Sequence, residues 1–580
     1  MKKRTYIGVS TTFHDPAVAV LNDQGDVLFA EAAERYLQYK RAPFCEPAPL
    51  LYLPEILKDH VGPGHEIVVA TSWGEQFTQY LERFSTSGFF TFDSVRTLEK
   101  KMTRSLVDSH NERALLSELH IGQQRAGHSV LIATERTFGH SNLELRRFNH
   151  HETHAAYGCF TSQFDEAACL VVDGLGGTAA SAIFEFRDGK LDRKKQFTGR
   201  ESIGFYFGLI TELCGWDPAK GEEWKVMGLA PYGKEDGELR TMINRLWRVE
   251  SGRIRASTEE EIASAIHDIK AYVANGDDQT QANLALEGQL GFERLMQNQI
   301  EATKSLVDSE NLVLVGGCAL NSTFNGKINS DASPTDVLFK NLFVPSAPAD
   351  DGNAIGAAML ALEQDNPGAS NQKRLLSPYL GKDLSAAKLD RIANGEPRVK
   401  HLGESVSKFA AERLADGKLV GWVQGRSEFG PRALGNRSIL ADARPEGAKD
   451  AINAKVKYRE AFRPFAPSIL HEHGPDWFEQ YQNTPYMERT LHFKEAVKGQ
   501  VPAVVHADGT GRLQSVSKEL NGRYYDLISH FHALTGVPLI LNTSFNIMGK
   551  PILHSAEDAL LMFYTTGIDV LVVGDYALEK

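Results

Sequence analysis

Short apolar runs separated by tight polar turns mark strands near the start of the chain. In residues 6–29, YIGVS and AVAVL flank the turn TTFHDP, and VLF follows a second turn, NDQGD. Residues 169–193 repeat this order, because CLVVD leads through GLGG to AASAIFEF and the turn RDGK. Such runs between Gly, Asp and Pro turns are typical of hairpins. Because the hairpin recurs about 160 residues later, the pattern predicts two related α/β halves with a cleft between them.

A third strand ends in glycines at 312–328, where LVLV precedes Gly316 and Gly317. The helix expected next begins near Asn321, and its N-terminus is suited to an anion or a nucleoside phosphate. Asp350 then opens the segment DDGNAIGAA, whose small residues predict a helix that packs closely against its neighbours. These segments continue the α/β pattern of the first part of the chain.

Residues 364–378 concentrate Pro, Gly, Ser and Asn, which predicts a linker. Beyond it the pattern predicts a second α/β domain with a helix at 406–416 and strands at 419–424, 538–541 and 570–574, the last of which ends the domain. We therefore expect one domain at 1–370 and another at 380–580. The polar, irregularly charged residues 88–125 are interpreted as helices covering one side of the first domain.

Composition fits a soluble globular enzyme of at least two domains, with 580 residues, 42% hydrophobic and 24% charged. A net charge of -12 weighs against a dedicated nucleic-acid binder. No apolar run approaches the ~20 residues that span a bilayer, and no apolar signal core follows MKKRTYIGVS, so the cytoplasm is the expected location. The five cysteines form no CxxC pair, which argues against a disulfide framework or a thiolate zinc site.

One stretch has a local charge opposite to that of the whole chain. Residues 425–463 hold nine basic side chains against five acidic ones. Arg matches phosphate oxygens with a planar fork, and Gly lets backbone N–H groups approach an anion. A solvated basic face is the ordinary alternative, but here turn formers accompany the cations, which favours an enclosed polyanion pocket. The cations concerned are Arg426, Arg432, Arg437, Lys457, Arg459 and Arg463.

Short polar side chains further along the chain are predicted to join this pocket. Ser544 and Asn546 follow a predicted strand and can offer hydroxyl and amide groups to phosphate or Mg²⁺, although alone they form an ordinary turn. With Lys457 and Arg459 they make a KxR…SxN set, which is a much rarer coincidence. Arg512, in GTGRLQSV, adds another candidate phosphate ligand. Since GxxxxGK[ST] is absent, the pocket is not a P-loop.

A candidate metal site begins at the segment NHHETHAA, which reads as a helix capped by Asn149. His150 and His154 are four residues apart and share a helix face, although two unrelated histidines would show the same spacing. Asp173 ends the next strand and Asp350 starts a later loop, and strand ends of this kind converge on one cleft. Two histidines with two carboxylates suit Fe²⁺, Mn²⁺ or Zn²⁺.

Two further side chains are candidates for roles in the cleft. His14 lies in the first hairpin loop and could take a proton from a nucleophile, or it could hold the loop through hydrogen bonds. Lys225, in EEWKVMGLAPYG, precedes a glycine turn and could reach a phosphate, or it could be a surface lysine.

Motifs along essentially the whole chain resemble those of the O-carbamoyltransferases of antibiotic, toxin and nodulation-factor biosynthesis. In order they read FHDPAVAV, HHETHAAYG, VVDGLGG, VMGLAPYG, GGCALN, DDGNAIGAA, GRSEFGPRALGNRSIL, VKYREAFRPFAPSI and LNTSFN. The resemblance implies an N-terminal domain similar to the Kae1 members of the actin-like ATPase fold and a C-terminal domain similar to YrdC. It also implies that the C-terminal domain makes carbamoyladenylate from carbamoyl phosphate and ATP with Mg²⁺.

The N-terminal domain would then transfer the carbamoyl group to a hydroxyl of a small natural product, with Fe²⁺ or another divalent metal bound. By resemblance the metal ligands are His150, His154, Asp173 and Asp350, with the adjacent Asp351 left open as the fourth. His14 would be the general base. The phosphates of both co-substrates would be held by Lys457, Arg459, Arg463, Arg512, Ser544 and Asn546, and the adenylate would approach Gly316 and Gly317.

Two other functions are compatible with the same domains. Threonylcarbamoyl transfer to tRNA is disfavoured by the acidic balance of the chain. A sugar-kinase-like or regulatory actin-fold protein would leave the KxR…SxN set unexplained. We therefore expect an alcohol, ATP and carbamoyl phosphate as partners, with no nucleic acid and no membrane, and the sequence leaves a homodimer open.

Overall fold

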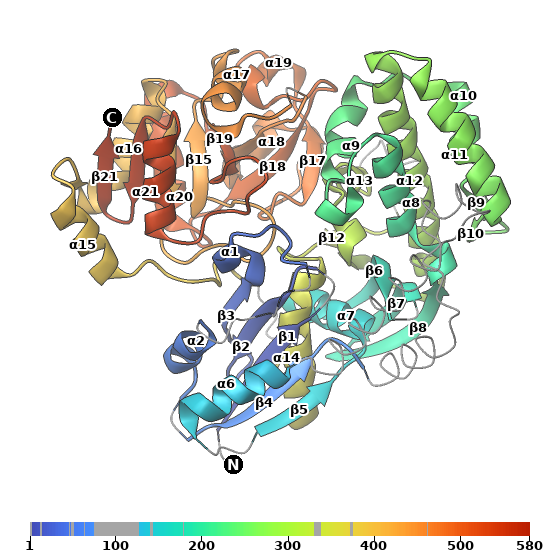
Figure 1. Cartoon of the computed structure of the whole chain (residues 1–580), viewed down its shortest axis with the longest axis horizontal. Coiled ribbons are helices and arrows are strands. Elements are labelled where there is room, and N and C mark those ends of the chain that lie inside the picture. The colour runs from blue at the N-terminus through green and yellow to red at the C-terminus, as the bar shows by residue number, and fades with distance from the viewer. Residues whose placement is uncertain are drawn as a thin grey trace, which may run out of the picture. The chain divides into compact units, whose positions relative to one another are not determined.

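The computed structural model describes residues 3–11, 14–43, 45, 47, 52–62, 64–74, 127–139, 143–177, 179–329, 338–371, 375–460 and 462–580. They form two compact units (Figure 1). Unit 1 comprises Met1–Ala33, Arg41–Leu320 and Pro334–Leu376, and unit 2 comprises Glu34–Lys40, Asn321–Ser333 and Ser377–Lys580. The chain passes into the long part of unit 2 after Leu376, within the stretch predicted as a linker. The interpretation of residues 88–125 as helices lies outside the described residues.

Unit 1 contains two five-stranded sheets with the same topology. The first has the order β3-β2-β1-β4-β5 and the second the order β8-β7-β6-β11-β12. In each, the first three strands along the chain pair antiparallel, the fourth pairs parallel with the first, and the fifth pairs parallel with the fourth. The strands are β1 Arg4–Ser10, β2 Ala17–Leu21, β3 Val27–Ala32, β4 Glu66–Thr71, β5 Leu143–Arg147, β6 Glu166–Gly176, β7 Ala179–Arg187, β8 Lys190–Thr198, β11 Asn311–Val315 and β12 Asn341–Phe343. The predicted duplication is confirmed, and the repeated topology is the one expected of an actin-like ATPase fold.

Two helices occupy the space between these sheets. α14 (Asn353–Asp365) packs on β1 and β2, and α7 (His150–Thr161) packs on β6 and β11, so that α14 and α7 lie against each other (Figure 1). The contact is close because Gly356 has no side chain, since a Cβ there would lie 1.9 Å from the carbonyl oxygen of Thr153. The small-residue helix predicted after Asp350 is therefore confirmed.

The remaining elements of unit 1 surround the second sheet or cover the first. They are α2 Leu53–His60, α6 His128–Phe138, α8 Ile203–Leu213, α9 Trp224–Leu229, α10 Gly237–Ile243, α11 Glu259–Ala274, α12 Asp278–Leu306 and the hairpin of β9 Trp247–Glu250 and β10 Arg253–Ala256. The prediction that GLGG forms a loop is wrong in part, because β6 continues to Gly176. The glycines serve packing there, because a Cβ on Gly176 would lie 2.4 Å from the His150 ring.

Unit 2 is built on one nine-stranded mixed sheet in the order β13-β21-β20-β14-β15-β19-β16-β18-β17. Its strands are β13 Lys400–His401, β14 Val420–Val423, β15 Arg437–Ala441, β16 Ala466–Leu470, β17 Arg489–His492, β18 Thr510–Val516, β19 Leu539–Ser544, β20 Val570–Val573 and β21 Tyr576–Glu579. The predicted helix and strands of the second α/β domain are confirmed. The prediction that the strand at 570–574 ends the domain is wrong, because β21 follows and pairs antiparallel with β20.

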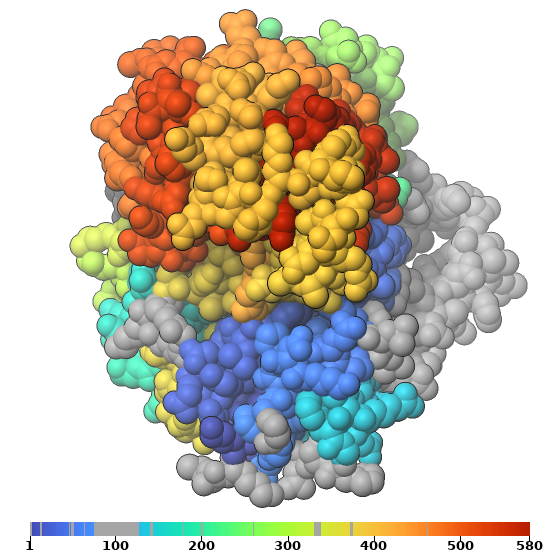
Figure 2. Space-filling model, turned by 90° about the vertical axis from the view of Figure 1, so that its left-hand side faces the viewer, coloured from blue at the N-terminus to red at the C-terminus, as the bar shows by residue number. Residues whose placement is uncertain are grey.

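Helices complete unit 2. They are α1 Ala33–Leu37, α13 Ser322–Lys327, α15 Ala386–Gly395, α16 Val406–Ala415, α17 Ala448–Ile452, α18 Gly474–Trp477, α19 Glu495–Lys498, α20 Gly522–Thr535 and α21 Ala556–Thr565. α15 contributes no buried residue and lies on the surface, in gold in Figure 2. None of the helices in the described part of the chain has the length and apolarity needed to cross a bilayer.

Candidate functional site

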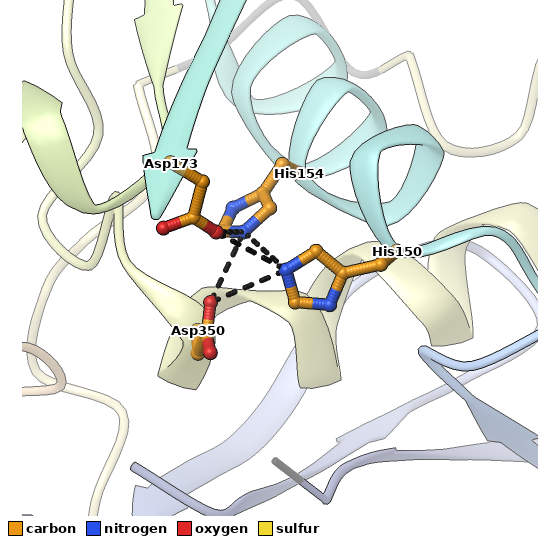
Figure 3. Close-up of side chains that lie close together, drawn as sticks. All are labelled: His150, His154, Asp173 and Asp350. Atoms are coloured by element: carbon orange, nitrogen blue, oxygen red, sulfur yellow. Dashed lines mark hydrogen bonds and ion pairs between the residues drawn. The ribbon is translucent and has the colours of Figure 1, made fainter. Parts of the chain in front are cut away.

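Four predicted side chains meet in unit 1 at the ends of three elements. His150 and His154 lie on one face of α7, Asp173 lies near the end of β6, and Asp350 opens the short turn that leads into α14 (Figure 3). Asn149 fixes the start of α7, since its side chain accepts from the backbone N–H groups of residues 151 and 152. The local sequence therefore aims both imidazoles at the two carboxylates.

The ligand atoms of this group surround a common point. The Nε2 atoms of His150 and His154 are 3.2 Å apart, and each lies 3.2 to 3.4 Å from Asp173 Oδ2 and Asp350 Oδ1. All four ligand atoms fall within 4.8 Å of one another. Two imidazole nitrogens and two carboxylate oxygens are a donor set that fits Fe²⁺, Mn²⁺ or Zn²⁺. Asp351 is not part of this group, since its Oδ1 accepts from the N–H of Gly352.

The predicted glycines support Asp173. Its Oδ1 accepts from the backbone N–H of Gly174 at 2.8 Å and faces that of Gly317 at 3.4 Å, which leaves Oδ2 for the imidazoles. Gly316 has a φ of +92°, and a Cβ there would lie 2.2 Å from the carbonyl oxygen of Val172. Only glycine fits this close, left-handed backbone. The two glycines therefore orient a candidate metal ligand.

The electrostatics of the group also suit a cation. Burial alone would lower the pKa of His150, but the carboxylates of Asp350 and Asp173 raise it to about 9. Burial would raise the pKa of Asp173, yet His150 and His154 hold it well below its usual range. Both carboxylates therefore stay ionised, and a divalent cation would neutralise their charge.

Removing both imidazoles should remove any bound metal. In His150→Ala/His154→Ala, metal content should fall from about one ion per chain to below about a tenth, because two carboxylates alone bind such ions weakly. Elemental analysis of the purified protein measures this content. His151→Ala is the matched control, since this neighbouring buried histidine lies outside the ligand group and should leave the metal in place. Stoichiometric metal in the double variant would refute the site.

His14 lies beside this group. Its Nδ1 is 2.9 Å from Asp15 Oδ2 and 3.8 Å from Asp350 Oδ2. Burial and Arg41 would lower the pKa of His14, but Asp15 and Asp350 raise it above its usual value. Because a carboxylate can only accept, Nδ1 carries the proton shared with Asp15, and Nε2 of the neutral ring is left as a proton acceptor. The geometry is compatible with the predicted role as a base.

In unit 2 the structure brings the predicted KxR…SxN residues together. Lys457 ends a π-helical turn at Asn453–Lys457, a distortion frequent at functional sites. Its Nζ lies 2.7 Å from Asn546 Oδ1 and 3.4 Å from Ser544 Oγ, and it also contacts the Ser544 carbonyl oxygen. Arg459 donates to Asn453 Oδ1 at 3.2 Å, and its guanidinium lies 4.4 Å from the Phe465 ring centre.

Several cations gather around this set, and we call Arg432, Lys457, Arg459, Arg463 and Arg512 the cation cluster. Burial lowers the pKa of Arg432 to about 10, and burial with Arg463 lowers that of Arg459 to about 9. Burial and the neighbouring Arg432, Arg459 and Arg463 hold the pKa of Arg512 well below its usual range. Among the described residues, Arg432 and Arg512 form no ion pair. Buried cations that repel one another are stabilised by an anion placed between them.

Two carbamoyltransferase family models match the chain, "Carbamoyltransferase N-terminus" over residues 95–359 and "Carbamoyltransferase C-terminus" over residues 411–580. Nodulation protein NolNO of Sinorhizobium fredii is 37% identical over 82% of this chain and 71% of its own length. Nodulation protein NolO of Bradyrhizobium diazoefficiens is 38% identical over 74% of this chain and 79% of its own length. The chain belongs to the carbamoyltransferase family. Among solved structures, full-length HypF in a phosphate- and nucleotide-bound form aligns at 12% identity and a TM-score of 0.36, over 63% of this chain and 47% of that one.

Not every predicted residue of this carbamoyltransferase joins a site. Arg426 donates to the carbonyl oxygens of Gly381 and Leu380, and Arg437 is fully buried and donates to four carbonyl oxygens. Both hold the backbone of the basic stretch in place. Glu428 does the same for N–H groups, since its Oε1 accepts from residues 434, 436 and 437. The expectation that Arg426 and Arg437 line a polyanion pocket is therefore replaced by a structural role, in which both arginines bind backbone carbonyl oxygens.

Lys225 and Asn321 are also engaged elsewhere. Lys225 Nζ lies 2.7 Å from Glu222 Oε1 and 5.8 Å from the ring centres of Trp216 and Trp224. Asn321 caps α13 in unit 2 by accepting from the N–H of Phe324. The helix that follows Gly317 is therefore short, and its capping residue is assigned to a different unit from the glycines.

A cavity of 540 Å³ in unit 1 was missed by sequence reasoning. It shares the side chain of His150 with the metal-ligand group, and the indole of Trp73 in its wall stacks on that imidazole at 4.6 Å. Its charged lining comprises Arg147, Glu152 and Arg193. These side chains come from β5, α7 and β8, so no local motif marks them.

Proposed function

We propose that the enzyme is an ATP-dependent O-carbamoyltransferase in which unit 2, as a YrdC-like domain, forms carbamoyladenylate and unit 1, as a Kae1-like domain, transfers its carbamoyl group to a small alcohol. The cation cluster carries the proposal, because it gathers five buried or half-buried cations of which Arg432 and Arg512 pair with no carboxylate among the described residues, and such a group calls for polyanionic substrates such as carbamoyl phosphate and ATP with Mg²⁺. Family membership supports the carbamoyl group as the transferred unit.

In unit 2, water cleaves carbamoyl phosphate to carbamate and phosphate, and a carbamate oxygen then displaces pyrophosphate from the α-phosphorus of ATP. Lys457 stands where it can stabilise charge on the transferred oxygens, held in place by Ser544 and Asn546. The arginines of the cluster bind the phosphate groups. Adenylation gives carbamate a good leaving group, which it otherwise lacks.

In unit 1, the acceptor hydroxyl attacks the carbamoyl carbon and AMP departs. The hydroxyl proton passes to Nε2 of His14, while the Asp15 carboxylate stabilises the imidazolium that forms. A divalent metal, for which we propose Fe²⁺, would be held by His150, His154, Asp173 and Asp350 and would supply positive charge near the phosphate of the adenylate.

The test incubates the purified protein with ATP, Mg²⁺, Fe²⁺ and ¹⁴C-carbamoyl phosphate. We expect a labelled adenylate and pyrophosphate release that requires carbamoyl phosphate. If neither is formed, the adenylate-forming role of unit 2 is wrong.

The cavity beside His150 offers room for the acceptor alcohol. Arg193→Ala should raise the acceptor KM about tenfold and leave adenylate formation unchanged, because the guanidinium lines the cavity and plays no part in unit 2. The measurement uses the alcohol that the wild type carbamoylates fastest in a screen of hydroxylated metabolites. Lys194→Ala is the matched control, because its side chain points to the opposite face of β8 and pairs with Glu185 and Asp192. An unchanged KM in Arg193→Ala would place the acceptor elsewhere.

A further inference from the structure

His506 belongs to the turn that leads into β18 in unit 2. Its backbone N–H donates to the carbonyl oxygen of Thr510 at 2.7 Å, and the N–H of Gly509 donates to the carbonyl oxygen of His506 at 2.9 Å. Its ring Nδ1 lies 3.1 Å from Thr510 Oγ1. Since Thr510 and Arg512 are two residues apart in a strand, their side chains share a face. His506 therefore lies on the face of β18 that carries a member of the cation cluster.

Hydrogen bonding around Thr510 fixes which ring nitrogen carries the proton. The Thr510 hydroxyl lies 2.6 Å from Asp508 Oδ1, and a carboxylate can only accept, so the single hydroxyl proton is directed at Asp508. The hydroxyl oxygen can then only accept from His506, which requires a proton on Nδ1. Nε2 of the neutral ring is left with a lone pair.

Within the described part of the chain, that lone pair meets no donor. Nε2 of His506 is buried, and among the described residues it has no hydrogen-bond partner; the same holds for Nε of Arg512. Burial lowers the pKa of His506 to about 4, and the nearby Arg512 and Lys449 add to this effect against the opposing charge of Asp508. The ring therefore stays neutral at pH 7. Leaving a buried acceptor and a buried donor unpaired is unfavourable, unless a ligand pairs with both.

A ligand that satisfies both atoms must offer an acceptor to the guanidinium and a hydrogen-bond donor to the imidazole. The ionised phosphate groups of ATP offer oxygens and no donor, and inorganic phosphate offers an O–H group but no N–H group. The carbamoyl group offers both a carbonyl oxygen and an NH₂ group, and in carbamoyl phosphate only a carbon and an oxygen separate the amide nitrogen from the phosphorus. The adenine amino group is much further from its phosphates, so it does not fit a position beside the arginines.

We propose that His506 Nε2 accepts a hydrogen bond from the carbamoyl NH₂ group, while Arg512 binds an oxygen of the same ligand, so that His506 selects carbamoyl phosphate over other acyl phosphates. This assignment rests on the proposed function of unit 2 and names the group that gives the site its specificity. A site built around an N–H donor rejects an analogue lacking it, because its buried acceptor is then left unpaired.

The experiment compares carbamoyl phosphate with acetyl phosphate, in which a methyl group replaces the NH₂ group. Full-length wild type, His506→Leu and His506→Gln are assayed for pyrophosphate release, with acetyl phosphate and inorganic phosphate as competitive inhibitors. In His506→Leu the KM for carbamoyl phosphate should rise about tenfold, while the inhibition constants of acetyl phosphate and phosphate change less than about twofold. His506→Gln should retain most of the preference, because its amide oxygen can replace Nε2 as acceptor.

Two results would overturn the assignment. One is a His506→Leu enzyme that keeps the wild-type ratio of the carbamoyl phosphate KM to the acetyl phosphate inhibition constant. The other is equal weakening of carbamoyl phosphate and inorganic phosphate in both variants, which would make His506 a support of the arginines. Failure of the proposed function appears differently, as a wild type that releases no pyrophosphate with carbamoyl phosphate. Calorimetric binding of carbamoyl phosphate and acetyl phosphate to the same three proteins then decides the assignment without turnover.

Discussion

Lys457→Ala should reduce carbamoyladenylate formation by about 10³-fold, to below detection in the ¹⁴C-carbamoyl phosphate assay. Lys457 is 2% exposed, its ammonium contacts Ser544 and Asn546, and the charges of Arg459 and Arg463 act on it. Burial and these two arginines hold the pKa of Lys457 well below the usual range, because they disfavour its charged form. An anionic ligand beside the ammonium offsets this cost. Lys457→Ala removes a positive charge from the place where, in the proposed reaction, negatively charged oxygens are transferred.

The matched control is Lys455→Ala, which removes an exposed lysine from the same π-helical turn. It should leave adenylate formation within about twofold of wild type, because an exposed charge is screened by water. Lys457→Met tests whether the loss follows charge or volume, since its apolar chain fills the space that alanine would leave. A fully active Lys457→Met enzyme would contradict the role of the ammonium, provided that its thermal unfolding matches wild type.

The duplicated sheets of unit 1 could be predicted because their signal is local. Each hairpin consists of apolar runs with turns between them, and these runs pair with their sequence neighbours, as β1 does with β2 and β6 with β7. The candidate metal ligands His150 and His154 were also visible, since a helix places residues four apart on one face. Asp350 could be separated from Asp351 only in three dimensions, because adjacent residues in a turn point in different directions.

The sequence of the basic stretch at residues 425–463 does not indicate which of its arginines are engaged by the protein backbone. Its composition does not separate Arg426 and Arg437, which bind carbonyl oxygens, from Arg432, which forms no ion pair among the described residues. Arg437 is enclosed because Gln424, Asn436 and other carbonyls converge on it, which depends on how β14 and β15 pair. The strands β16 and β18 were missed for a related reason, since Pro, Gly and polar residues interrupt their apolar pattern.

The role proposed for His506 could likewise not be predicted from the sequence. In sequence it is one histidine in a polar turn, and nothing in HADGTGR indicates which nitrogen is protonated. Its chemistry follows from the directed hydrogen bond between Thr510 and Asp508 and from burial beside Arg512. Such features depend on tertiary contacts, so the specificity that we propose for His506 could not be predicted from the sequence, whereas the candidate phosphate-binding residues could.

His14→Asn should permit carbamoyladenylate formation and reduce carbamoyl transfer by about 10²–10⁴-fold. In the proposed reaction the two halves use different units, and His14 lies outside the cation cluster. An aliphatic hydroxyl is barely ionised at neutral pH, so its attack on the carbamoyl carbon needs a base within reach. Asparagine keeps a polar side chain that can bond to Asp15 but has no basic nitrogen.

The measurement follows labelled adenylate and labelled product by chromatography in the same reaction. Adenylate should accumulate in His14→Asn while product is lost, whereas Lys457→Ala should form neither. His128→Asn, at an exposed position at the start of α6, should behave as wild type. If His14→Asn instead fails to form adenylate, the division of labour between the two units is wrong, because the base would then be required before the intermediate exists.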